Sequence, residues 1–91
     1  MTIKEVKEMY KGKYADFEVY KPLSKEHYPN RFHIDNCKYT ENYNEDSKVG
    51  MFNLMDEEDY KTSINAYSSM EVDFYECYGN KDAKVLCVML A

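Results

Sequence analysis

The chain has 91 residues, enough for one domain with one modest core and little room for a separate catalytic scaffold. Apolar residues make up 44% of it, and this content excludes a disordered chain. The net charge of −5 disfavours direct binding to nucleic acid, and ten tyrosines without a tryptophan supply apolar area with polar tips.

The first two elements are a capped helix and a half-buried strand. Thr2 and Glu5 have the spacing of a capping box, and Gly12 is well placed to end the helix. The helical stripe between them consists of Ile3, Val6, Met9 and Tyr10. Residues 14–20 alternate, so that Phe17 and Val19 point to one face of a strand and their neighbours to the other.

The middle of the chain is irregular. Pro22 and Pro29 interrupt it, and Arg31–Ile34 has the alternation of a short strand. Residues 36–48 have neither a helical nor a strand period, and we expect a long loop there. A second strand is expected at Val49–Met55.

Asp56 begins a second helix, because it is a good N-cap and three further acids follow it in the first turn. The helix is expected over about 56–67, with Tyr60, Ile64 and Tyr67 on its buried side. Runs at 72–78 and 84–90 then predict two strands joined by a turn at Gly79–Asp82. Residues 85–90 are apolar on both faces, which is typical of a central strand.

These elements predict a single α+β domain over residues 1–91. We expect a small antiparallel or mixed sheet of four to five strands with two helices packed on it. The N-terminus lacks an apolar signal segment, and the longest apolar run is too short for a membrane span. Three cysteines cannot all pair within one chain, so a cytoplasmic protein with reduced thiols and no membrane contact is expected.

The acidic residues are concentrated in the second half. Residues 41–82 hold eleven acids and three lysines, whereas residues 1–40 hold six acids and eight bases. Capping accounts for Asp56 and Asp59, and a solvated face accounts for others, but the bias over forty residues favours an anionic surface that meets a basic protein. Of the loop tyrosines Tyr28, Tyr39 and Tyr43, the last two stand beside acids, as interface aromatics often do. The predicted partner-binding set is Tyr39, Glu41, Tyr43, Glu45, Asp46, Asp56, Glu57, Glu58, Glu71, Asp73 and Glu76.

A metal site is the main alternative. His33 and Cys37 have a spacing compatible with two zinc ligands, and His27 or one of the cysteines on the predicted hairpin, Cys77 or Cys87, would add a third. The same residues are also explained as ordinary loop and core side chains. We therefore expect no cofactor, with zinc as the alternative. Cys37 with His33 as a nucleophile pair lacks a third, orienting group. The sequence contains no phosphate-binding loop, HExxH, GxSxG or CxxC motif, and we expect no enzyme.

The second half of the chain also carries a resemblance. The run MDEEDYKTSINAYSS followed by CYGNKDAKVLCVML resembles small proteins from phages and conjugative elements of gut Firmicutes. Small acidic proteins of that setting include anti-CRISPR inhibitors of the Cas9 type, some of which occupy the DNA-binding surface of their target. The resemblance implies such an inhibitor and carries over no functional residue.

The leading hypothesis is therefore a non-enzymatic, protein-binding inhibitor. Its acidic surface would block the nucleic-acid-binding face of a host-defence nuclease, with a CRISPR nuclease as the concrete candidate. A small zinc-binding structural domain built on the His33/Cys37 loop is one alternative. Another is an accessory protein of a mobile genetic element, with a homodimer formed along the edge of the predicted hairpin.

Overall fold

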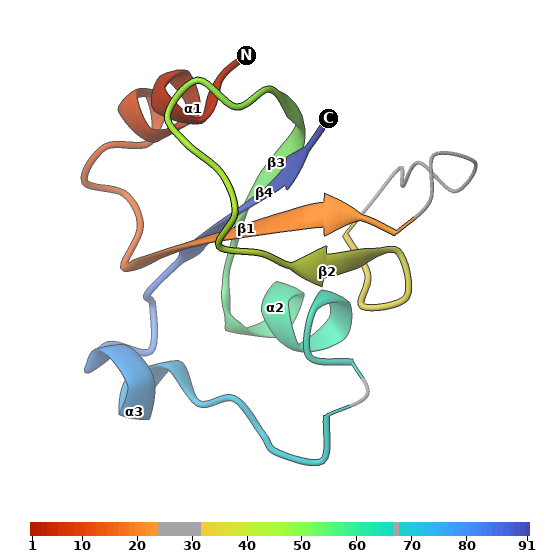
Figure 1. The fold of residues 1–91 in the computed structure, drawn as a ribbon. Coiled ribbons are helices and arrows are strands. Elements are labelled where there is room, and N and C mark those ends of the chain that lie inside the picture. The colour runs from red at the N-terminus through yellow and green to blue at the C-terminus, as the bar shows by residue number, and fades with distance from the viewer. Residues whose placement is uncertain (24–31, 67) are drawn as a thin grey trace.

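A computed structural model describes residues 1–23, 32–66 and 68–91, which form one sheet with helices on both faces (Figure 1). The strand order is β2-β1-β4-β3, with β1 and β4 parallel and the other two pairs antiparallel. This arrangement confirms the expected α+β fold with a small mixed sheet. In chain order the elements are α1 (Ile3–Met9), β1 (Asp16–Pro22), β2 (Cys37–Tyr39), β3 (Val49–Met55), α2 (Glu57–Ser63), α3 (Phe74–Tyr78) and β4 (Val85–Leu90).

The first helix begins as its local sequence predicts. The Thr2 hydroxyl accepts a hydrogen bond from the Glu5 backbone N–H at 3.3 Å, and the Glu5 carboxylate accepts one from the Thr2 N–H at 3.1 Å. This reciprocal pair is the capping box, and it satisfies two backbone donors that the helix itself leaves unpaired. Of the predicted apolar stripe, Ile3 and Val6 are completely buried and Tyr10 packs against the same layer, whereas Met9 is 50% exposed.

The last strand, β4, lies at the centre of the sheet, between β1 and β3. Its residues from Val85 to Met89 are all completely buried. Side chains alternate along a strand, so Leu86 and Val88 pack toward α1 while Val85, Cys87 and Met89 pack toward α2 and α3. The prediction of a central strand from its two apolar faces is confirmed.

The core is consequently divided by the sheet into two layers. On the α1 side the buried residues are Ile3, Val6, Val19, Leu86 and Val88. On the other side they are Tyr20, Phe32, Cys37, Met55, Phe74, Ala83, Val85, Cys87 and Met89, with Tyr60 and Ile64 of α2 packed against them. In Figure 1, α1 lies above the sheet and α2 and α3 below it.

The prediction of a strand at 72–78 was wrong, because Phe74–Tyr78 is the helix α3. The Asp73 carboxylate accepts hydrogen bonds from the backbone N–H groups of Tyr75 (2.9 Å) and Glu76 (3.2 Å), which caps the helix start. Gly79 ends the helix in the left-handed region, at φ 71°. The predicted hairpin therefore does not form, and β4 has no free edge for the dimer that the hairpin suggested.

The irregular middle of the chain also differs from expectation. Within the predicted loop at 36–48, Cys37–Tyr39 forms the edge strand β2, with Cys37 opposite Pro22 and Tyr39 opposite Tyr20. The predicted strand at 31–34 is absent in its described part, residues 32–34, while Arg31 lies outside the described residues. The second helix ends at Ser63 rather than near Tyr67, which also lies outside them.

Candidate interaction site

Helix α2 begins at the acid that the sequence indicated. The Asp56 carboxylate accepts a hydrogen bond from the Asp59 backbone N–H at 2.8 Å and so caps the helix. The first turn carries three acids, Glu57, Glu58 and Asp59, next to the positive end of the helix dipole. Capping and the dipole therefore give these acids a structural role at the start of α2.

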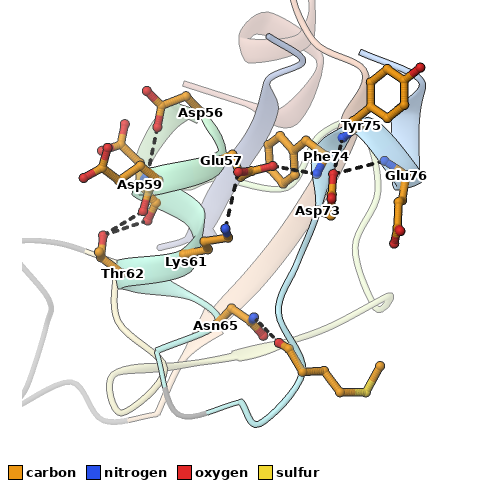
Figure 2. Close-up of polar contacts among 12 residues, drawn as sticks. Asp56, Glu57, Asp59, Lys61, Thr62, Asn65, Asp73, Phe74, Tyr75 and Glu76 are labelled. Carbon is orange, nitrogen blue, oxygen red and sulfur yellow. Dashed lines mark hydrogen bonds and ion pairs between the residues drawn. The ribbon is translucent and has the colours of Figure 1, made fainter. Parts of the chain in front are cut away.

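A single carboxylate joins α2 to α3 (Figure 2). One oxygen of Glu57 lies 3.3 Å from the Lys61 ammonium group, one turn along α2. The other oxygen accepts a hydrogen bond of 2.7 Å from the backbone N–H of Phe74, at the start of α3. Since that N–H has no partner within its own helix, Glu57 acts as a cap supplied from a distant part of the chain.

The side chain of Phe74 fixes the orientation of α3. It is completely buried and packs edge-on against Tyr60, at 5.7 Å between ring centroids, and against Tyr78, at 5.2 Å. With Phe74 and Tyr78 directed inward, the intervening residues face solvent. Tyr75 is 66% exposed and projects away from the body of the protein in Figure 2.

The charge of this region is almost unopposed. Residues 56–76 contain seven acids and one base, Lys61, which is occupied by Glu57. None of the other six carboxylates makes an ion pair with a residue that the structure describes. We call these six carboxylates, together with the exposed Tyr75 and the 77% exposed Met70, the acidic surface. Its acids are Asp56, Glu58, Asp59, Glu71, Asp73 and Glu76.

The predicted contact residues of the loop lie elsewhere. The loop at 44–47 is bonded to the start of α1, where the backbone N–H of Lys4 donates to the Glu45 carbonyl at 3.1 Å. The Glu45 side chain pairs with Lys7 at 3.2 Å. Because α1 covers the opposite face of the sheet, Glu45 and Asp46 are separated from the acids of α2 and α3 by the sheet.

The two predicted loop tyrosines differ in exposure. Tyr43 is half-buried and packs against Phe17 at 6.4 Å between ring centroids, so it contributes to the core on the α1 side. Tyr39 is 50% exposed on β2, and its hydroxyl lies 3.5 Å from the Glu41 carboxylate. Tyr75 was missed as a contact residue, although the cap signals at Asp73 and Gly79 predict a helix that would direct it outward.

The predicted metal ligands do not form a cluster. The Cys37 thiol is buried and donates a hydrogen bond to the His33 carbonyl at 3.2 Å, while the His33 ring accepts one from the Asp35 N–H at 3.1 Å. Cys77 is exposed on α3 and Cys87 is buried in β4, so the hairpin that would have brought them together is missing. Over residues 1–23, 32–66 and 68–91, no three His, Cys, Asp or Glu side chains are arranged to hold a metal ion. His27 lies outside these ranges.

Burial also affects the thiol that was considered as a nucleophile. It raises the pKa of Cys37, although the hydrogen bond with His33 opposes the shift. A raised pKa keeps the group as a thiol at neutral pH, and the thiolate is the reactive form. The Cys37 environment therefore does not favour nucleophilic chemistry.

A cavity of about 550 Å³ opens on the α2 side of the sheet, between α2 and the strands β1 and β2. Its volume is within the range of small-molecule sites, about 300–1,000 Å³. Its lining combines apolar side chains with the carboxylate of Glu18 and tyrosine rings. These residues come from three separate parts of the chain, and none was among the predicted site residues except Tyr39 and Cys37.

The chain matches no protein-family model, no curated protein and no solved structure. None of the described helices has the length and apolar character needed to cross a bilayer.

Proposed function

We propose that this protein is a non-enzymatic binding protein whose acidic surface docks on a basic surface of another protein. The observation that carries the proposal is the set of six carboxylates on 56–76 that have no cationic partner among the described residues. An anionic patch of this kind steers a basic partner toward it and repels nucleic acid.

The exposed side chains within the acidic surface support docking rather than solvation alone. Tyr75 and Met70 are 66% and 77% exposed, and in the chain Met70 precedes Glu71 and Tyr75 precedes Glu76. Aromatic residues and methionine are enriched in the centres of protein interfaces, where charged residues are depleted and form the rim. We therefore assign Tyr75 as the central contact and the carboxylates as its charged surroundings.

The partner we propose is a nucleic-acid enzyme with a cationic groove, inhibited when the groove is covered. Carboxylates pair with the same arginine and lysine side chains that bind phosphate groups. The resemblance to small proteins of Firmicute phages and conjugative elements, a setting that includes anti-CRISPR inhibitors, makes a CRISPR nuclease of the Cas9 type the first partner to test.

The test measures association with a purified Cas9-type nuclease loaded with its guide RNA, at about 50 mM and about 500 mM salt. The variant E58Q/D59N/E76Q removes three charges from the acidic surface. The matched control E8Q/E41Q/D46N removes three exposed charges outside it and so changes the net charge equally. We expect the first variant to slow association by about tenfold or more at low salt and the control to slow it less than about threefold.

One set of results would contradict docking through the acidic surface, and another would contradict the choice of partner. Equal slowing by the two variants, or an affinity that is the same at both salt concentrations, would contradict docking through the acidic surface. If the nuclease does not bind, the partner is wrong, and an arginine-rich peptide then tests the surface by NMR. Chemical-shift changes confined to residues 56–76 would support the acidic surface as the binding site for a basic partner. Changes outside these residues would contradict the proposal.

A further inference from the structure

The cavity between α2 and the strands β1 and β2 has a mostly apolar wall. Leu23 and Ile34 line it from the ends of the loop between β1 and β2, and Ile64 lines it from the end of α2. Leu23 is 55% exposed and Ile34 is 39% exposed, so both present apolar surface to the opening. Removing such surface from water is the main driving force for binding a small apolar ligand.

One carboxylate lies in this apolar lining. Glu18 is partly buried on β1, and it makes no ion pair with any residue that the structure describes. Its oxygen accepts a hydrogen bond of 2.9 Å from the Tyr20 hydroxyl, and it also interacts with the hydroxyl of Tyr60 on α2. The two phenol hydroxyls satisfy part of the hydrogen-bonding capacity of the carboxylate, but no described residue supplies a counter-ion for its charge. A partly buried charge without a counter-ion is costly.

Lys38 also borders the cavity but does not neutralise Glu18. Lys38 lies opposite Lys21 in the β1–β2 ladder, and paired residues direct their side chains to the same face. Alternation along β2 places Lys38 on the opposite side of the strand from Cys37 and Tyr39, and although Lys38 borders the cavity, no ion pair joins it to Glu18. Among the residues that the structure describes, Glu18 therefore has no cationic partner in the cavity.

We propose that this cavity binds a small organic amine, with a protonated primary ammonium group on Glu18 and an aromatic or branched aliphatic body against Leu23, Ile34 and Ile64. An ammonium group supplies the positive charge that the carboxylate lacks, through a charge-assisted hydrogen bond. The rings of Tyr20, Tyr39 and Tyr60 add a surface that favours a cation. An anionic ligand of the same shape would meet the Glu18 charge and be excluded.

This site is distinct from the acidic surface proposed for protein docking. On α2, Tyr60 and Ile64 face the cavity, whereas Glu58 and Asp59 are exposed. Variants at the two sites therefore separate the two proposals.

The test uses three probes of similar size, the cation 2-phenylethylamine, the neutral 2-phenylethanol and the anion 3-phenylpropanoate, titrated against the full chain at neutral pH. Backbone amide shifts in NMR spectra report both affinity and location. We expect the amine to bind about tenfold tighter than the alcohol and the carboxylate not to bind. Shifts should cluster at residues 18–23, 34–39 and 60–64.

The variant E18Q keeps an acceptor for the tyrosine hydroxyls and removes the charge. It should lower the affinity for the amine about tenfold and leave the affinity for the alcohol unchanged. The matched control E58Q makes the same chemical change on the exposed side of α2 and should alter neither. Replacing the exposed Ile34 by serine should weaken the amine and the alcohol alike, because it removes apolar wall.

The ratio of amine to alcohol affinity in the unmodified protein decides the proposal, even if E18Q proves to be unfolded by circular dichroism. Equal affinities for the two probes would overturn it. The same holds if no probe binds at about 10 mM, a concentration that detects even very weak ligands. Amine shifts that map to the acidic surface would overturn it as well, since they would reflect general attraction to carboxylates.

Discussion

The carboxylate of Glu57 determines whether α2 and α3 form one preorganised unit. Replacing it with alanine removes the 2.7 Å hydrogen bond from the Phe74 N–H and the 3.3 Å contact with Lys61. Phe74 is completely buried, so its backbone N–H at the start of α3 has limited access to replacement water. We therefore expect Glu57→Ala to destabilise the fold and to loosen α3 more than the rest of the chain.

The size of the effect follows from these two contacts. A hydrogen bond to a charged group contributes about 1.5–3 kcal/mol, and a helical ion pair four residues apart about 0.3–0.5 kcal/mol. The Glu57 side chain is 33% exposed, and solvent screening places the first contribution at the low end of its range. The free energy of unfolding should fall by about 2 kcal/mol, equivalent to a decrease in Tm of roughly 10 °C for a domain of this size.

Urea unfolding followed by circular dichroism measures this change, and amide hydrogen exchange locates it. Exchange at Phe74 and its neighbours in α3 should accelerate more than exchange in β4. The control Glu58→Ala removes the adjacent exposed acid from the same helical turn, and it should cost no more than about 0.5 kcal/mol. Glu57→Gln, which keeps an acceptor for the Phe74 N–H, should fall between the two.

Equal losses for Glu57→Ala and Glu58→Ala would refute this reasoning, because they would show that the dipole and not the junction accounts for the cost. So would uniform acceleration of exchange over the whole chain. The result also bears on binding, since a preorganised acidic surface has less ordering entropy to lose when a partner docks.

Three further predictions concern the core, the thiols and alkaline pH. Leu86→Ala, at a completely buried position of the central strand, should lower the free energy of unfolding by about 2–5 kcal/mol, whereas Met70→Ala at a 77% exposed position should change it by less than about 0.5 kcal/mol in the same urea assay. A thiol reagent at about pH 8 should label Cys77 rapidly and the two buried cysteines only on unfolding, and mass spectrometry that finds all three labelled at one rate would contradict their burial. Burial, followed by the charge of Glu18, raises the pKa of Tyr20 and Tyr60. The unfolded chain loses these protons near pH 10 while the folded chain retains them, so stability should fall as the pH rises past about 10. Urea midpoints that are unchanged between about pH 8 and pH 10.5 would contradict this prediction.

Elements whose signals are local could be predicted without the structure. The capping box at Thr2 and Glu5 and the cap at Asp56 each act within one helical turn, so their spacing was sufficient to predict where α1 and α2 begin. The two apolar faces of β4 reflect burial that the strand carries in its own residues. The alternation in β1 predicted the strand but not its burial, because Val19 and Tyr20 on opposite faces are both buried and the strand is not half-buried as expected. From these signals, the α+β class and the central position of β4 could be predicted.

At residues 72–78 the local pattern is not sufficient to distinguish a strand from a helix. Their pattern fits a strand, but it also fits a short helix with Asp73 before it and Gly79 after it. The choice depends on Glu57, seventeen residues earlier in the chain, and on the packing of Phe74 against Tyr60. Five residues have little helical stability of their own, so tertiary contacts decided this element.

The pairing of the strands and the candidate sites depend on contacts between segments that are distant in the chain. β2 has three residues, too few for a recognisable period, and it becomes a strand by pairing with the end of β1. The parallel pairing of β1 with β4 joins residues about seventy positions apart, which no local spacing encodes. The sequence indicated the excess of acid on 41–82, but the sheet separates the acids beside α1 from those on α2 and α3. The cavity around Glu18 likewise exists because three distant segments meet on one face of the sheet, where each depends on the others for its position.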